Sequence, residues 1–173
     1  MTDTADHLHP NTMLPQLSLT ATDGSDVCLA ALPRRTLLIV YPWTGRPGLA
    51  NPPNWDNIPG AHGSTPELEG FRDLETDFAK RGVRLYALST QTTDYQGEMV
   101  RRLRIPFPAL SDAERMFSRS LGLPSFETGG ESYLKRLTLV IANGRIETVF
   151  YPVAEPARHA VEILSWLAVN KAG

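Results

Sequence analysis

The run Thr36-Leu37-Leu38-Ile39-Val40-Tyr41 decides the fold of this chain. It is a short, continuous apolar run without alternating polar positions, which is typical of a central strand buried on both faces of a sheet. The stretch that follows, residues 43–63, contains four prolines and two tryptophans and cannot form a regular element. A loop of this length is usually functional or disordered, and its tryptophans favour a packed loop.

Helical and strand patterns alternate on either side of this run. Leu68, Phe71 and Phe78 recur at helical spacing and predict a helix over 65–81. Asn143-Gly144 between two apolar runs predicts a late β-hairpin. Further strands are expected at 17–22, 27–29, 83–89, 109–110, 134–141 and 145–151, and further helices at 95–104, 113–121 and 156–169. The order predicts an α/β fold with a central mixed sheet flanked by helices, an N-terminal β-hairpin and a long loop.

Length and charge limit the classes of function. The 173 residues suit a single domain, expected over 13–170, with residues 1–12 as a flexible arm. The net charge of −2 argues against nucleic acid as a partner, and the absence of a long apolar run argues against a membrane. The polar N-terminus does not resemble a secretory signal, so a cytoplasmic location is expected.

Neither a disulfide nor a metal site is expected. Cys28 is the only cysteine, and on a predicted strand it is interpreted as a structural thiol. The four histidines are scattered and show no metal-binding spacing, so we expect no metal and no cofactor.

The segment Gly63-Ser64-Thr65-Pro66-Glu67 begins the helix expected over 65–81. Its local pattern allows a purely structural interpretation, in which Ser64 caps the helix and forms a capping box with Glu67. His62 is also near enough in sequence to act as a base for Ser64, but no acidic residue that would orient it is evident.

Several motifs in this order resemble those of the peroxiredoxins, most closely the bacterioferritin-comigratory-protein type. The resemblance covers nearly the whole chain and rests on Tyr41-Pro42, Ser64-Thr65-Pro66-Glu67, Phe71-Arg72-Asp73, Leu110-Ser111-Asp112 and Arg136-Leu137-Thr138. It implies a thioredoxin-like fold and a thiol-dependent peroxidase. Ser64 stands where that family has its peroxide-reducing cysteine.

The resemblance also implies roles for other residues. Arg136 matches the family's active-site arginine, although it could simply pair with Glu67 or Glu131. Thr44 would supply a hydroxyl and Pro42 would shield the pocket from water. The expected substrate-binding residues are Trp43, Gly63, Thr65 and Glu67. The implied partners are hydrogen peroxide or an organic hydroperoxide and a thioredoxin-like or small-thiol reductant, for a monomer or homodimer.

Serine at position 64 leaves two hypotheses. A hydroxyl has no accessible anion at neutral pH and forms no sulfenic acid, so the chain as written is expected to be inactive as a peroxidase. Either Ser64 replaces a cysteine of the unmodified protein, or the chain is a natural thiol-free relative with a repurposed pocket. Glu69, where some relatives carry a resolving cysteine, favours the second hypothesis. So does the long loop, whose Trp43, Arg46 and Trp55 could line a site for a bulkier ligand.

Overall fold

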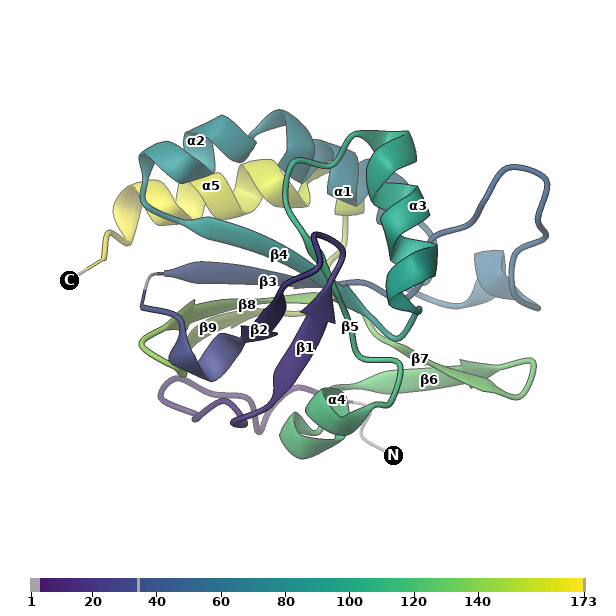
Figure 1. Ribbon diagram of the computed structural model, residues 1–173, viewed down its shortest axis with the longest axis horizontal. Helices are drawn as coiled ribbons and strands as arrows, with labels where there is room; N and C mark the ends of the chain where they lie inside the picture. Colours follow the sequence, from purple (N-terminus) through teal and green to yellow (C-terminus); the bar gives the residue numbers. More distant parts are fainter. Residues whose placement is uncertain (1–3, 34, 173) are drawn as a thin grey trace.

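The computed structural model describes residues 4–33 and 35–172 (Figure 1). Its centre is a seven-stranded mixed sheet with the order β2-β1-β5-β4-β3-β8-β9. β3 (Thr36–Val40) pairs in parallel with β4 (Arg84–Ser89) and antiparallel with β8 (Leu137–Ala142). Every residue of β3 is buried, which confirms the central strand predicted from its apolar run.

Two hairpins extend the sheet as predicted. β1 pairs antiparallel with both β2 and β5, and β9 pairs antiparallel with β8. Asn143 and Gly144, between β8 and β9, both have positive φ (53° and 75°), as this kind of hairpin turn requires. The remaining strands of the sheet are β1 (Ser18–Ala21), β2 (Asp26–Cys28), β5 (Ala109–Ser111) and β9 (Arg145–Phe150).

Helices cover the sheet, and none described is long and apolar enough to cross a bilayer. The α-helices are α1 (Ser64–Asp73), α2 (Glu75–Lys80), α3 (Thr93–Leu103), α4 (Met116–Leu121) and α5 (His159–Val169). The short 3-10 turns are η1 (Leu29–Ala31), η2 (Trp55–Asn57) and η3 (Pro156–Arg158). The helix predicted over 65–81 is broken at Leu74, and the one predicted over 113–121 begins later because Arg115 adopts a left-handed conformation (φ 63°).

The two faces of the sheet bury separate hydrophobic cores. Leu38 belongs to the core that contains Phe117 of α4, whereas Leu37 belongs to the core that contains Phe71 of α1. This division follows from the alternation of side chains along β3. Figure 1 shows α1, α2 and α5 together over one face.

The N-terminal segment is packed against the rest of the protein, whereas a flexible arm was expected. Leu8 and Leu14 are buried (4% and 3% exposed), and the Asn11 amide donates to the Ile146 carbonyl of β9 at 2.8 Å. Residues 4–14 therefore lie packed against the body of the protein. Residues 1–3 of the predicted arm lie outside the described residues.

A separate two-stranded sheet was not predicted. It consists of β6 (Ser125–Thr128) and β7 (Glu131–Leu134), which pair antiparallel across Gly129-Gly130. That Gly-Gly pair is itself a hairpin signal. In Figure 1 the hairpin and the loop of residues 43–63 extend from the same side of the molecule.

Candidate functional site

The candidate site begins at the first residue of α1. Gly63 precedes the helix with φ +112°, and a Cβ there would lie 2.9 Å from Pro156 Cγ. Only glycine satisfies both the positive φ and this close approach. The capping-box interpretation is wrong, because Ser64 is already the first residue of the helix and Gly63 is the residue that precedes it. The Glu67 side chain turns to Arg136 instead of reaching back to the start of the helix.

Arg136, immediately before β8, is the centre of the site. It is only 3% exposed. Its Nη1 donates to Ser64 Oγ at 3.2 Å and to Glu67 Oε1 at 2.9 Å. Of the two acidic partners that the sequence allowed, Arg136 therefore pairs with Glu67. Glu131 is mostly exposed and lies 3.8 Å from Arg115.

The second terminal nitrogen of Arg136 fixes the end of the long loop. Nη2 donates to the carbonyls of Gly60, Ala61 and His62 at 3.2, 3.0 and 3.3 Å. The guanidinium thus joins the loop, the start of α1 and the start of β8. The planar fork of an arginine suits this role, because it presents several donors in a fixed geometry.

Burial changes the protonation of Glu67. Its side chain is only 1% exposed. Burial raises the pKa of Glu67 to about 7, while Arg136 acts in the opposite direction through its charge and its hydrogen bond. Burial thus favours the protonated form of this carboxyl group, and the neighbouring guanidinium favours its charged form.

His159, at the start of α5, lies close to the same guanidinium. Its Nε2 is 2.8 Å from Thr138 Oγ1, and its ring meets Phe71 edge-on. Burial, followed by the positive charge of Arg136, lowers the pKa of His159 to about 4. His159 is therefore neutral at pH 7. Nothing in the local sequence indicated it, because Phe71 and Thr138 reach it only through the fold.

A small cavity lies in front of Ser64. We call it the Ser64 cavity, and its volume is about 120 Å³. It is lined by Trp43, Thr44, Gly45, Asn51, Trp55, Ala61, His62, Gly63, Ser64, Thr65 and Pro66. Five of the residues expected at the site are among them. The other three, Pro42, Glu67 and Arg136, are buried but are not part of the lining. A cavity of this volume suits a ligand of a few heavy atoms.

Thr44 reaches the cavity but directs its hydroxyl elsewhere. Its Oγ1 lies 3.3 Å from Gln91 Oε1, and its backbone amide donates to the same oxygen at 3.1 Å. Gln91 Nε2 donates in return to the Thr44 carbonyl at 3.0 Å. No hydrogen bond joins Thr44 to Ser64 among the described residues. Sequence reasoning missed Gln91, which holds the first turn of the loop in place.

Aromatic rings close the loop side of the cavity. Trp43 and Trp55 pack edge-to-face with ring centroids 5.4 Å apart. Trp55 also packs against Phe126 and Tyr133 of the β6–β7 hairpin, at 5.6 and 5.1 Å. The prediction of a packed loop is confirmed. Arg46, however, stacks on Tyr95 of α3 at 4.0 Å and does not line the cavity.

A histidine–aspartate pair lies beside the cavity. His62 Nδ1 is 3.5 Å from Asp56 Oδ1, so the acidic partner that the sequence did not reveal is present. Both side chains are exposed, at 78% and 76%. Within the described part of the chain, no hydrogen bond connects His62 to Ser64, whose Oγ is bonded to Arg136. A serine–histidine–aspartate triad is therefore not assembled.

Cys28 lies apart from this site. It is at the end of β2 and is partly buried, and its Sγ contacts Gln16 Oε1 at 3.9 Å. It is not among the residues of the Ser64 cavity. In residues 4–33 and 35–172, no group of three or more His, Cys, Asp or Glu side chains could hold a metal ion.

Comparison with known proteins identifies the class. The sequence pattern of the Redoxin family matches residues 9–164, and the chain belongs to this family. It is 25% identical over 155 residues to a chloroplastic peroxiredoxin Q of Gentiana triflora. The matched region covers 88% of this chain and 64% of that relative. The chain spans less than two thirds of the length of the curated plant relatives it matches.

Solved structures show the same fold. Peroxidoxin BcpB from Mycobacterium tuberculosis has a TM-score of 0.76 at 22% identity, covering 96% of this chain and all of the other. A cysteine-to-serine mutant of PrxQ from Xylella fastidiosa has a TM-score of 0.77 at 18% identity, covering 95% and 98% of the two chains. The predicted resemblance to bacterioferritin-comigratory-type peroxiredoxins and the thioredoxin-like fold are both confirmed.

Proposed function

We propose that the Ser64 cavity is a peroxide-binding site of the peroxiredoxin type, and that the chain, with an oxygen at position 64, does not reduce peroxide at a useful rate. One observation carries this proposal: Arg136 Nη1 donates to the side-chain oxygen of residue 64, and that residue is at the first turn of a helix and lines a small cavity. A helix start and a fixed cation both stabilise an anion at that atom.

A cysteine at position 64 would complete the chemistry. Its thiolate would attack the terminal oxygen of a hydrogen peroxide or organic hydroperoxide, forming an S–O bond as the O–O bond breaks. The leaving hydroxide or alkoxide takes up a proton, and the sulfur becomes a sulfenic acid. Two thiols of a reductant then return the sulfenic acid to the thiol, forming their own disulfide and releasing water.

The serine oxygen cannot replace that thiolate. A helix start stabilises a negative charge by about 1–2 kcal/mol at most, or roughly one pKa unit. An alcohol would need a shift of many units to ionise near pH 7. Glu69 stands where some relatives carry a resolving cysteine, so an active form would be reduced directly by a thioredoxin-like protein or a small thiol. A cytoplasmic location and a monomeric or dimeric state remain predictions.

The test restores the thiol on a background without Cys28. The double variant Ser64→Cys/Cys28→Ser and the single variant Cys28→Ser are compared for consumption of hydrogen peroxide with dithiothreitol as reductant. We expect continuous turnover by the double variant and none by the single variant. A folded double variant without turnover would contradict the proposal.

A thiol-free protein with a repurposed pocket is the second candidate. It is favoured by the buried Ser64 hydroxyl, which the Arg136 guanidinium already satisfies, and by the aromatic wall of Trp43 and Trp55. The native gene distinguishes the two origins of Ser64. A cysteine codon at position 64 supports replacement of a catalytic cysteine, whereas a serine codon supports a natural thiol-free relative.

A further inference from the structure

The atom at position 64 lies deep in its cavity. Ser64 is 4% exposed, and the Ser64 cavity in front of it has a volume of about 120 Å³. Reacting atoms are held about 3–3.5 Å apart before a bond forms, so the oxygen that residue 64 would attack must enter the cavity. In an organic hydroperoxide, only one further oxygen separates that atom from the first carbon. The substituents of the first carbon must therefore also fit between the cavity walls.

Two tryptophans form the wall of the cavity on the loop side. Trp43 and Trp55 both line it and pack edge-to-face with ring centroids 5.4 Å apart. The Trp43 ring also lies over Gly45, where an added Cβ would be 3.1 Å from the Cη2 atom of Trp43 and 3.7 Å from Asn51 Oδ1. Trp43 is partly exposed, whereas Trp55 is only 4% exposed. Trp43 is therefore the ring of the two that an entering ligand meets first.

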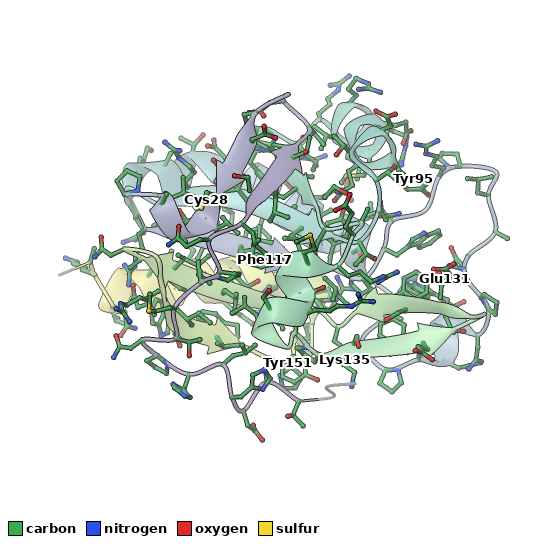
Figure 2. The ribbon with its side chains drawn as sticks, turned by 60° about the horizontal axis from the view of Figure 1, so that its bottom comes forward. Cys28, Tyr95, Phe117, Glu131, Lys135 and Tyr151 are labelled. Atoms are coloured by element: carbon green, nitrogen blue, oxygen red, sulfur yellow. The ribbon has the colours of Figure 1, made fainter. Side chains whose placement is uncertain are left out.

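Contacts on both sides hold this wall in place. Trp55 is packed against two rings of the β6–β7 hairpin. Arg102 of α3 donates to the Gly45 carbonyl at 3.0 Å, and Arg46 stacks on Tyr95 at 4.0 Å. Figure 2 shows Tyr95 beside the long loop. A bulky ligand would therefore have to displace packed side chains, which is unfavourable for the same reason that overpacking a core is.

We propose that Trp43 determines the size of the peroxide that reaches residue 64. Hydrogen peroxide and unbranched hydroperoxides enter, whereas a tertiary hydroperoxide such as cumene hydroperoxide is excluded. This inference rests on the proposed function, because it names the substrate class of the same site. A tertiary carbon carries three carbon substituents close to the reacting oxygen, and these compete with the Trp43 ring for space. The loop backbone at residues 61 and 62, which also lines the cavity, does not make room because Arg136 holds its carbonyls.

The first experiment compares two peroxides in the variant Ser64→Cys/Cys28→Ser. We expect the second-order rate constant to be at least about tenfold larger for hydrogen peroxide than for cumene hydroperoxide. Adding Trp43→Ala should reduce this ratio by about tenfold, because the substituents of the tertiary carbon then fit. Leu49→Ala is the matched control. Leu49 is an exposed apolar residue of the same loop and does not line the Ser64 cavity, so its truncation should leave the ratio unchanged.

A second experiment measures the same size limit without a peroxide. A thiolate attacks the sulfenyl sulfur of a methanethiosulfonate, so that a disulfide forms and methanesulfinate leaves with the electron pair of the broken S–S bond. The reagents are methyl methanethiosulfonate and the bulky tetramethylpyrroline nitroxide reagent. Cys28 of the parent chain is partly exposed and lies away from the long loop in Figure 2, so it gives the rate ratio of an open thiol. The thiol at position 64 should favour the methyl reagent at least about tenfold more than Cys28 does, and Trp43→Ala should remove most of this preference.

The two experiments separate this inference from the peroxide proposal. Turnover of both peroxides at equal rates, or a ratio that Trp43→Ala does not change, would overturn the role of Trp43 and leave the peroxide proposal intact. No turnover of either peroxide, together with a Trp43-dependent preference for the methyl reagent, would contradict the peroxide proposal and support the size limit. The same reagent preference at positions 64 and 28 would overturn the size limit. If Trp43→Ala does not fold, Trp43→Leu replaces it and should change both ratios in the same direction by a smaller factor.

Discussion

Ser64 and Cys28 occupy opposite kinds of surroundings. Ser64 is 4% exposed, begins a ten-residue helix and accepts a hydrogen bond from a buried arginine. Cys28 ends the edge strand β2, is partly exposed, and has Gln16 as its side-chain partner. The chain thus has an oxygen where the surroundings favour an anionic sulfur, and its sulfur where they do not.

This comparison shows that the surroundings suited to a reactive thiol and the sulfur atom itself are at different positions in the chain. A positive charge and helix-terminal amides favour an anion, and neither is among the described contacts of Cys28, whose Sγ contacts Gln16 Oε1. If residue type alone were considered, Cys28 would be the expected reactive position, because it is the single cysteine of the sequence. The geometry points to position 64, because it is there that the fold has gathered Arg136, Glu67 and a cavity.

The largest expected effect comes from removing the guanidinium. Arg136→Met should lower the free energy of unfolding by about 3–5 kcal/mol, because it leaves a buried acid and three loop carbonyls without their donor. Urea unfolding followed by circular dichroism measures this change. Arg136→Lys keeps the charge but loses the fork, and we expect it to recover only part of the loss. Complete recovery would show that charge alone holds this region together.

The aromatic packing around Trp55 should contribute slightly less to the free energy of unfolding than Arg136 does. Trp55→Ala should destabilise the protein by about 3 kcal/mol, because it removes a ring that packs against Trp43, Phe126 and Tyr133. Trp55→Phe is the matched control and should lose much less. Thermal unfolding and hydrogen exchange at residues 43–63 measure both effects. Unchanged exchange in Trp55→Ala would mean that the loop is held by Arg136 and Gln91 alone.

A smaller effect is expected in the pH dependence of stability. The pKa of Glu67 is raised in the folded protein to about 7, so its contribution is fully present below the unfolded pKa near 4.5 and is lost as pH rises toward 7. Glu67→Gln should remove this loss. Urea unfolding from pH 4 to 8 tests it, and an identical slope in both proteins would contradict the assignment.

His159 acts in the opposite direction over much of the same pH range. Its pKa is lowered in the folded protein to about 4, so its contribution is present above the unfolded pKa near 6.5 and is lost as pH falls toward 4. The two slopes oppose each other where the ranges overlap, so His159→Gln should leave stability falling as pH rises, whereas Glu67→Gln should leave stability rising with pH. The two variants together separate the two groups.

Local patterns predicted much of the fold. The buried run 36–41, the Asn143-Gly144 hairpin and the helix after the long loop could be read from periodicity and turn chemistry. The β6–β7 hairpin was missed, although Gly129-Gly130 signalled its turn. The break at Leu74 and the left-handed Arg115 had no comparable local signal.

The candidate site was predicted only in part, because its contacts are long-range. Ser64, Thr65, Gly63, Trp43 and Thr44 do meet at one cavity. Which acid pairs with Arg136, and that Gln91 takes the Thr44 hydroxyl, depend on residues many positions away in sequence. Sequence reasoning had left the first of these open and did not include the second.

The central claim is that surroundings, not residue type, define the reactive position. The direct test compares two proteins with one thiol each: the parent chain, whose thiol is at position 28, and Ser64→Cys/Cys28→Ser, whose thiol is at position 64. Stopped-flow measurement gives the second-order rate constant of each with hydrogen peroxide at pH 7. The thiol at position 64 should react at least about 100-fold faster, because the helix start and the fixed donor of Arg136 stabilise a thiolate there. Equal rate constants for the two thiols would contradict the claim.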